Sequence, residues 1–435
     1  MSPVVLPSLP SQSAAVLYGP RDLRLESRVL FPPHQGECQV KVLATGLCGS
    51  DLHYFLAGRN GDFAVQAPLV LGHEAAGVIT AVGPGVATTY PNLKVGTRVA
   101  IEAGVMCKNC KHCSEERYNL CKNMRFCSSA KTFPHLDGTL QEKMNHPAHV
   151  LHPLPDNVSF DQAALAEPLS VLLHASRRAG VCPSAITPSL SLPFKLASSP
   201  SPASVFPSPT ASPGPNSSAK RVLVLGVGAI GLLACALARS VGVTRICAVD
   251  INQNRLDFAT QEGFVDKDGA FCLPLPPTKA TGKEKEDPMV ALNRSKRYAL
   301  AALEKFGEPD GFDVVYECTG AESCIQIAVH TALTGGKIAL VGMGTPNVHL
   351  PLAAAALREV DLIGSFRYAN TYPEALRLLS ASSANSHWDL GQKVSRLVTH
   401  RFGLVDTKRA FEVLAKGRDE NGGVVLKIVI GSGQV

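Results

Sequence analysis

The stretch RVLVLGVGAIG, residues 221–231, decides the fold of the second half of the chain. Its valine- and leucine-rich start predicts a buried strand, and the apolar residues that follow have helical spacing. Gly226, Gly228 and Gly231 form the pattern G-x-G-x-x-G at the junction. The first glycine permits a tight turn, the second lets the backbone approach a pyrophosphate, and the third lets helix and strand pack closely. The stretch therefore predicts a dinucleotide-binding unit with phosphates at the helix N-terminus.

The residues after this stretch alternate between strand-like and helix-like patterns. Strand-like runs at 245–250, 312–320 and 336–344 are separated by helix-like runs at 252–263 and 322–333. Such alternation is typical of a parallel, doubly wound sheet with helices on both faces. A Gly-rich turn in an unrelated α/β fold is the alternative, and the alternation makes it the weaker one.

Asp250 indicates which dinucleotide this unit binds. It ends the second predicted strand, 24 residues after Gly226. A carboxylate there can accept hydrogen bonds from the adenosine ribose and repels a 2′-phosphate, which favours NAD over NADP. Arg255 could cover the adenine, or could instead favour NADP and so oppose the effect of Asp250. We expect NAD.

The first 165 residues have a different character. Short valine-rich runs broken by Gly and Pro predict a compact, mostly antiparallel β domain. We expect this domain to span residues 1–170 and the dinucleotide domain to span 171–365. The last part, 366–435, returns to mixed helix and strand patterns and is expected to complete the first domain.

Two polar stretches interrupt these patterns. Residues 183–218 are rich in Pro and Ser, with Lys195 the only charge. Such a composition buries too little apolar area to offset ordering, so we expect a disordered surface loop, with a domain linker as the competing interpretation. Residues 273–293 are also polar, and we expect a surface excursion there.

Composition excludes several classes of protein. The chain has 435 residues, 45% hydrophobic and 18% charged, with a net charge of +6. This is ordinary for a globular protein, and no basic run with interleaved aromatics suggests nucleic acid. No apolar run is long enough for a membrane span, and the N-terminus lacks the pattern of a secretory signal. We expect a cytoplasmic protein.

A cluster of cysteines, CKNCKHCSEERYNLC at 107–121, predicts a metal site. Cys107, Cys110, Cys113 and Cys121 can surround one ion as a tetrahedron of thiolates. Four sulfurs fill the coordination of zinc, so this zinc would be structural. Disulfides are disfavoured in a reducing compartment, and free thiols or an iron–sulfur cluster are the remaining alternatives.

A second, scattered set of residues could hold a catalytic metal. Cys48, His73, Glu74 and Glu167 supply a thiolate, an imidazole and carboxylates, which could bind zinc and leave a position for water or substrate. Spacing alone is weak evidence, because a lone histidine in an apolar strand is more often a core residue.

A family resemblance strengthens that second set. The stretch GHEAAGVITAVGPGV, residues 72–86, resembles the zinc signature of the zinc-dependent medium-chain alcohol dehydrogenase family. The cysteine cluster resembles that family's structural-zinc lobe, and GVGAIG its coenzyme fingerprint. CGSDLHYF, AEPLSVLLHASRRAG and LREVDLIGSFRYANTYPEAL resemble the branch of sorbitol, xylitol and arabinitol dehydrogenases.

The resemblance implies a fold and a set of functional residues. The fold is α/β, with a GroES-like β-rich catalytic domain and a Rossmann domain. Catalytic zinc would be held by Cys48, His73 and Glu74, with Glu167 nearby through water or as an exchanging ligand. Ser50 and His53 match a proton relay. Polyol hydroxyls would contact Tyr54, Glu167, Arg367 and Tyr368. Coenzyme contacts match Gly226, Gly228, Ile230, Gly231, Asp250, Arg255, Val341, Gly342, Met343, Ser365, Phe366 and Arg367.

The implied activity is NAD-linked oxidation of a secondary alcohol of a polyol such as sorbitol or xylitol, with two zinc ions per chain. Zinc acts there as a Lewis acid on the hydroxyl, and NAD accepts the hydride. A dehydrogenase for another secondary alcohol, such as threonine or butanediol, and a noncatalytic dinucleotide-binding relative are the alternatives. The family also implies a homodimer or homotetramer. The loop FCSSAKTFPHLDGTL, residues 126–140, departs from the family pattern, which leaves the preferred polyol open.

Overall fold

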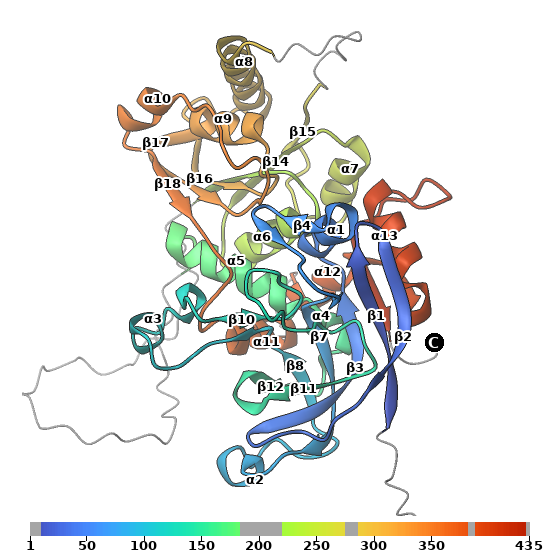
Figure 1. The fold of residues 1–435 in the computed structure, drawn as a ribbon. Helices are drawn as coiled ribbons and strands as arrows, with labels where there is room; N and C mark the ends of the chain where they lie inside the picture. Colours follow the sequence, from blue (N-terminus) through green and yellow to red (C-terminus); the bar gives the residue numbers. More distant parts are fainter. Residues whose placement is uncertain (1–9, 183–219, 275–285, 382–387, 432–435) are drawn as a thin grey trace, which may run out of the picture.

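The computed structural model describes residues 10–182, 220–274, 286–381 and 388–431. The alternating half of the chain forms one parallel sheet, in the order β15-β14-β13-β16-β17-β18 (Figure 1). Its strands are β13 (Arg221–Leu225), β14 (Arg245–Asp250), β15 (Ala270–Cys272), β16 (Phe312–Glu317), β17 (Ala332–Leu340) and β18 (Asp361–Gly364). The helices between and beside them are α6 (Ala229–Ser240), α7 (Gln253–Gln261), α8 (Pro288–Phe306), α9 (Glu322–Thr331) and α10 (Leu352–Ala356).

Both faces of this sheet are buried, as a doubly wound sheet requires. Side chains alternate along a strand, so Val222 and Val224 of β13 face one layer while Leu223 and Leu225 face the other. The first pair packs in the same core as α6, and the second pair packs in the same core as α8 and α9. The predicted parallel, doubly wound sheet is confirmed.

The remaining strands build a mostly antiparallel β region. A seven-stranded sheet has the order β12-β8-β7-β3-β20-β19, with β11 also paired to β3, and a three-stranded sheet has the order β2-β1-β6. The strands are β1 (Ser11–Gly19), β2 (Asp22–Val29), β3 (Glu37–Gly46), β6 (Leu69–Val70), β7 (Glu74–Val82), β8 (Arg98–Ile101), β11 (Lys143–Pro147), β12 (Leu151–Pro153), β19 (Val398–Gly403) and β20 (Lys427–Gly431). Within these two sheets, β19–β20 is parallel and the other pairs are antiparallel.

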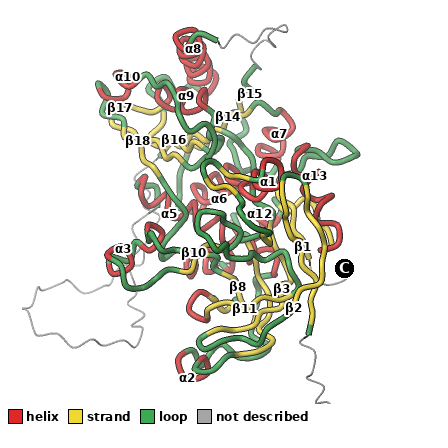
Figure 2. The backbone as a smooth tube through the Cα atoms, viewed as in Figure 1, coloured by secondary structure: helices red, strands yellow, loops and turns green. Residues whose placement is uncertain are grey.

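Short elements connect these layers. They are α1 (Gly49–Ala57), β4 (Arg59–Asn60), β5 (Phe63–Ala64), α2 (Val86–Thr89), β9 (Gly104–Val105), α3 (Lys111–Ser114), η1 (Tyr118–Leu120), β10 (Arg125–Phe126), η2 (Ala148–Val150), α4 (Phe160–Ala164), α5 (Ala166–Ala179), α11 (Tyr372–Ser380), α12 (Leu390–Ser395), η3 (Leu404–Asp406) and α13 (Thr407–Lys416). Figure 2 shows α3 standing at the side of the molecule with loop on either side of it. Among the described helices, none has the length and apolarity needed to cross a membrane.

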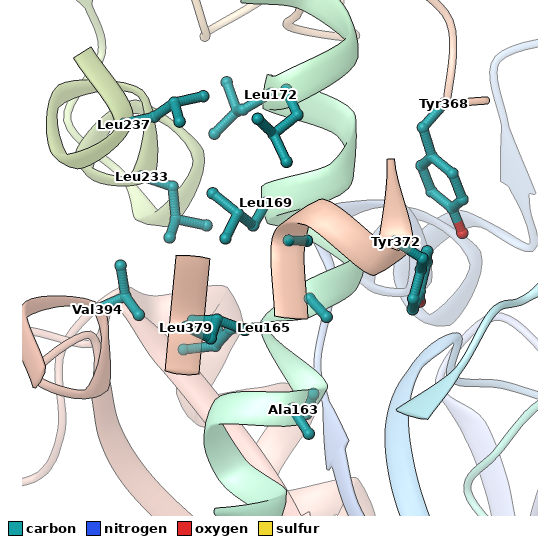
Figure 3. Close-up of a cluster of buried hydrophobic side chains, with 14 of the residues drawn as sticks. Ala163, Leu165, Leu169, Leu172, Leu233, Leu237, Tyr368, Tyr372, Leu379 and Val394 are labelled. Carbon is teal, nitrogen blue, oxygen red and sulfur yellow. The ribbon is translucent and has the colours of Figure 1, made fainter. Parts of the chain in front are cut away.

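Helix α5 links the antiparallel and parallel regions through a shared apolar core. Its buried Leu169 and Leu172 lie beside Leu233 and Leu237 of α6, and α11 and α12 add Leu379 and Val394 (Figure 3). The predicted boundary at residue 170 lies within α5, and the domain boundaries themselves stay a prediction. The core that α5 shares with α6 ties the region bearing the scattered zinc residues to the dinucleotide unit.

One predicted surface stretch contains the start of a helix that its polar pattern did not indicate, although residues 286–293 within it are exposed or half-buried. Helix α8 begins at Pro288, inside the polar stretch 273–293, because Asp287 caps it by accepting hydrogen bonds from the amides of Met289 (2.7 Å) and Val290 (3.3 Å). An acidic N-cap followed by proline is a helix-start signal, which the polar composition obscured. Residues 275–285 and the predicted loop 183–218 lie outside the described residues.

The core around α5 predicts a stability effect. Leu169→Ala removes a fully buried side chain and should destabilise the protein by about 2–5 kcal/mol, because the transfer and cavity costs add. Val95→Ala is the control, since Val95 is 64% exposed. In thermal unfolding, the midpoint of the Leu169→Ala variant should be clearly lower than that of the wild type, and the midpoint of the control should be almost unchanged. Equal midpoints would contradict the packing role.

Candidate active site

The dinucleotide turn lies at the carboxyl edge of the parallel sheet. Gly226 has φ of +88°, in the left-handed region that favours glycine, and a Cβ there would lie 2.4 Å from Cγ2 of Thr319. A Cβ on Gly231 would lie 1.9 Å from the carbonyl oxygen of Gly226. A Cβ on Gly228 would meet no protein atom within 4 Å. The turn is therefore closely packed on the protein side and open at Gly228, which fits the approach of a pyrophosphate to its backbone.

Asp250 holds this turn while ending β14. Its Oδ2 accepts the Val227 amide at 2.7 Å and its Oδ1 accepts the Asn252 amide at 2.9 Å. Each carboxylate oxygen has two lone pairs, so the group keeps capacity for ribose hydroxyls. The structure therefore gives Asp250 a second task that the sequence did not suggest, which is to fix the glycine turn.

A pocket opens beside Asp250, with a volume of about 430 Å³. One wall is the end of β14 and the start of α7, including Asp250 and Arg255. The other wall is the end of α13 and the turn after it, including Lys416 and Arg418. The second wall belongs to the C-terminal part of the chain and carries two cations. Sequence reasoning missed it, because nothing near those residues indicates a nucleotide.

The other predicted coenzyme residues follow neighbouring parallel strands. Val341, Gly342 and Met343 follow β17, and Ser365, Phe366 and Arg367 follow β18. Ile230 lies in the first turn of α6. A Cβ on Gly342 would lie 2.2 Å from the Gly320 amide nitrogen, so this loop packs directly on the turn after β16. Ligands of open α/β sheets bind outside this edge, where the structure brings these residues together.

The cysteine cluster at 107–121, which we call the cysteine lobe, gathers its four sulfurs. Sγ–Sγ distances are 3.5 Å for Cys107–Cys121, 3.6 Å for Cys110–Cys113 and 3.9 Å for Cys107–Cys113. Disulfide sulfurs would be about 2.05 Å apart, whereas a zinc tetrahedron with bonds near 2.3 Å has edges of about 3.8 Å. The Asn109 amide lowers the pKa of Cys107 to about 6, which favours the thiolate, whereas burial raises the pKa of Cys113 to about 12. The four residues fit a zinc ion.

The scattered set also comes together. Ligand atoms of Cys48, His73 and Glu74 all lie within 4.8 Å of one another. Cys48 precedes α1, His73 precedes β7, and Glu74 begins that strand. A thiolate, an imidazole and a carboxylate are three donors that zinc accepts, and three donors leave a fourth position for a ligand.

Asp51 sets the orientation of His73. Its Oδ1 lies 3.2 Å from Nδ1 of His73, and both side chains are buried. Oδ1 also accepts hydrogen bonds from the Gly72 amide and the Ser128 hydroxyl. A carboxylate on Nδ1 leaves Nε2 for a metal and raises the basicity of the ring. The local sequence around Asp51 indicates no such role, because its partner His73 lies 22 residues away.

The charge around these residues suits a cation. Burial disfavours the charged imidazole, but the charges of Asp51 and Cys48 outweigh it, so the pKa of His73 is raised well above its usual value. Burial raises the pKa of Glu167 to about 7, with a further contribution from Glu74. Three carboxyl groups, those of Asp51, Glu74 and Glu167, thus interact with His73 or with one another around this set, which suits a divalent metal ion.

Lys427 binds Glu74 from the last strand. Its Nζ donates to Oε1 at 2.9 Å and Oε2 at 2.7 Å, and also to the Leu47 carbonyl at 3.1 Å. Burial lowers the pKa of Lys427, and the nearby Glu74 more than offsets this, so it is raised. Glu74 therefore has a cationic partner on both oxygens, a feature that no local pattern in the sequence indicated.

The two predicted relay residues lie in different surroundings. The Ser50 hydroxyl lies 3.3 Å from Sγ of Cys48 and 3.5 Å from Nε2 of His73. His53 lies on an exposed part of α1. Ser50 is thus brought into the candidate metal site, whereas His53 faces solvent.

The predicted substrate residues lie close to the same site. Arg367 places its guanidinium 3.8 Å from the centroid of the Phe126 ring, and that ring lies 5.5 Å from the His73 ring. Tyr54 and Tyr368 are buried, and the Tyr54 hydroxyl accepts the Ala130 amide at 3.0 Å. Glu167 is buried in the first turn of α5. The roles of these residues stay predictions.

Comparisons with known proteins agree with this geometry. Residues 34–156 match the family model for the alcohol dehydrogenase GroES-like domain, and residues 287–381 match that for zinc-binding dehydrogenases. Human sorbitol dehydrogenase is 35% identical over 408 residues, which cover 94% of both chains. The chain belongs to the zinc-dependent medium-chain dehydrogenase family. Sorbitol dehydrogenase from Arabidopsis thaliana is also 35% identical, over 93% of this chain and 92% of its own.

A solved structure of an oxidoreductase has the same fold as this chain. An oxidoreductase of unknown specificity from Escherichia coli superposes with a TM-score of 0.71 at 28% identity, covering 98% of this chain and all of its own. The predicted pairing of a GroES-like domain with a Rossmann sheet is confirmed for this member of the zinc-dependent dehydrogenases.

The glycine turn predicts a contrast between two similar substitutions. Gly228→Ala should leave stability nearly unchanged, because the added Cβ meets open space, but should raise the KM for NAD at least about tenfold by occupying the path of the pyrophosphate. Gly231→Ala should instead lower stability, because its Cβ collides with the Gly226 carbonyl. Thermal unfolding and coenzyme titration separate the two. Unchanged NAD binding by the first variant would contradict the placement.

Asp51 predicts an effect on metal affinity. Asp51→Asn should weaken zinc binding by the Cys48–His73–Glu74 set about 10–100-fold, because the imidazole loses its orienting carboxylate. The cysteine lobe should keep its zinc. Zinc counted per chain during titration with a chelator measures this, with Asp62→Asn, at an exposed position, as the control. Identical chelator curves would show that Asp51 does not support a ligand.

Proposed function

We propose that this zinc-dependent dehydrogenase oxidises a secondary hydroxyl of a polyol, such as sorbitol or xylitol, to the ketone, with NAD as hydride acceptor. The observation that carries the proposal is the incomplete donor set of half-buried Cys48 and buried His73 and Glu74, near the carboxyl edge where coenzyme residues gather. The four sulfurs of the cysteine lobe would fill a zinc ion completely, so they are assigned a structural role. Two zinc ions per chain follow from these two sets.

The substrate class is supported by the relatives and by the surroundings of Arg367. Relatives at about 35% identity are named sorbitol dehydrogenases. A guanidinium and the hydroxyls of Tyr54 and Tyr368 supply the polar groups that a chain of hydroxyls needs. Burial lowers the pKa of Arg367, yet its guanidinium remains charged at any working pH. Arg367 can therefore donate several hydrogen bonds to a polyol.

The chemistry can be divided between the bound groups and the protein. A zinc ion held by Cys48, His73 and Glu74 would lower the pKa of a secondary hydroxyl, and NAD at the glycine turn would accept the hydride. Asp51 keeps Nε2 of His73 available. Ser50 lies beside Cys48 and His73, where its hydroxyl can receive and pass on a proton. Glu167 supplies a second buried carboxylate, which could pass on a proton or exchange with another ligand of the zinc ion.

The assembly and location belong to the same proposal. We propose a cytoplasmic homodimer or homotetramer. Strand β18 ends the described order of the parallel sheet, and near it α10 and the residue after it expose Leu352 (66%) and Leu357 (87%). A sheet edge flanked by exposed apolar side chains supports pairing of two such sheets. Sedimentation analysis of the purified protein measures the state.

One substitution tests the assignment of the catalytic metal. Cys48→Ser should lower kcat/KM for sorbitol or xylitol by at least about 100-fold, because a Lewis acid contributes several kcal/mol to the reaction. The variant should stay folded and lose one of two zinc ions. Cys272→Ser, at a half-buried thiol outside both metal sets, is the control and should keep both.

Assays with four alcohols test which substrate class the protein prefers. The wild-type protein is assayed with sorbitol, xylitol, threonine and 2,3-butanediol, each with NAD and NADP. Higher kcat/KM for the polyols with NAD is the expected result. Preference for threonine or butanediol would overturn the polyol assignment while leaving the zinc dehydrogenase intact, and an active Cys48→Ser variant would overturn the metal assignment.

A further inference from the structure

The segment 366–370, which we call the crossing segment, connects β18 to the residues before α11. In Figure 1 it runs from β18 down toward the side of the molecule where α3 lies. Arg367 (φ +50°) and Asn370 (φ +57°) both have left-handed backbones. Asparagine tolerates this region, but arginine adopts it at a cost of order 1 kcal/mol or more, so surrounding contacts must hold the segment.

Those contacts come from the cysteine lobe. Nδ2 of Asn119 donates to the Phe366 carbonyl at 2.9 Å, and the Asn370 amide donates to the Tyr118 hydroxyl at 2.8 Å. Nδ2 of Asn370 donates to the Glu116 carbonyl, also at 2.8 Å. These three hydrogen bonds, which we call the grip, bind Phe366 and Asn370 at the two ends of the crossing segment, with Arg367 between them. All three lobe partners lie between Cys113 and Cys121, the third and fourth sulfurs of the cluster.

The grip is itself anchored in the protein interior. The Tyr118 hydroxyl donates to Oε1 of Glu102 at 2.8 Å, and Oε2 of Glu102 lies 2.7 Å from Nε2 of His152. Glu102 is 3% exposed and Asn119 is 5% exposed. Because buried groups in a satisfied network rarely change partners, Tyr118 has a defined position from which to hold Asn370.

The held segment places Arg367 near the candidate metal site. The guanidinium lies over Phe126 and donates to the Ser129 hydroxyl at 3.3 Å. Phe126 lies in turn against His73. Residues that follow Cys121 by only a few positions thus supply the surface on which the cation rests. The cysteine lobe therefore binds the segment on either side of Arg367. Phe126 and Ser129, which follow the lobe, contact its side chain.

We propose that the cysteine lobe positions the substrate-binding arginine, with Tyr118 and Asn119 as positioning residues that act through Arg367. Metal binding closes the loop from Cys107 to Cys121, which fixes the three hydrogen-bonding groups in one arrangement. Opening that loop releases the crossing segment and misplaces the guanidinium. The lobe's metal thereby affects polyol binding without touching the polyol. This inference rests on the proposed function, because it takes Arg367 as a contact of the polyol.

Hydrogen exchange tests the grip without any use of activity. Amide exchange is measured for the peptide covering residues 366–371 in the zinc-loaded protein. Tyr118→Phe and Asn119→Ala should each speed that exchange about tenfold, since losing one buried hydrogen bond costs about 1.4 kcal/mol. Cys110→Ser, which opens the metal site, should do at least as much and lose one zinc. Lys111→Ala is the matched control on the same lobe, because its side chain is 81% exposed.

A double-substitution cycle tests whether the grip acts through Arg367. At saturating NAD, Asn119→Ala should raise the KM for the polyol about tenfold in the wild-type background and less than about twofold in an Arg367→Ala background. Such non-additivity is expected of residues that work through one group. A merely structural role would give equal factors in both backgrounds.

The outcomes separate the inference from the function it rests on. Unchanged exchange in both Tyr118→Phe and Asn119→Ala, or full additivity with Arg367→Ala, overturns the positioning role. If the wild-type protein oxidises no polyol, the proposed function fails, and with it the claim about substrate. Faster exchange in the lobe variants would then still establish the grip itself.

Discussion

A buried ion pair joins the two strands that flank β3 in the seven-stranded antiparallel sheet. Glu74 begins β7, Lys427 begins β20, and both are almost fully buried. Leaving either charge without its partner in such a place costs several kcal/mol, so the pair constrains the strands that carry it. β20 must lie next to β3, and β7 on the other side of β3, for the two side chains to meet. The same arrangement brings Cys48 to His73 and Glu74.

The two sets of zinc donors differ in what surrounds them. The cysteine lobe takes all its donors from one short segment at the side of the molecule, whereas the second set takes donors from two segments of the catalytic region and supports from the C-terminal strand. A local set can complete a coordination shell on its own. A set assembled from distant segments is instead shaped by the whole fold, and its three donors leave one coordination position for another ligand. The crossing segment, held by the lobe, connects the two.

Much of this arrangement could be predicted because its signals are local. The strands and helices around Gly226, Gly228 and Gly231 and the spacing of the four cysteines each lie within one short stretch. Asp51 and Lys427 could not be predicted in the same way. Asp51 matters only because the fold brings His73 to it, and Lys427 contacts Glu74 across 353 positions of sequence. Helix α8 was missed for a different reason, since a polar stretch hid the capping aspartate at its start. His53 and Ser50 lie in the same helix, and only their exposure in the folded protein tells them apart.

The pairing of β20 with β3 has a consequence for the order in which the chain folds during synthesis. The parallel sheet is built from one continuous stretch, and its strands have all been made once residue 364 has left the ribosome. The antiparallel sheet contains strands from the first part of the chain. β7 covers one edge of β3 and β11 covers residues 37–41 of the other, but Thr45 and Gly46 on that second edge have no strand partner until β20 appears. The Lys427–Leu47 hydrogen bond closes a separation of 380 residues. An early sheet with an open edge is prone to pair with the wrong chain. The nascent protein therefore depends on β20 to complete the edge of β3 that β11 leaves open.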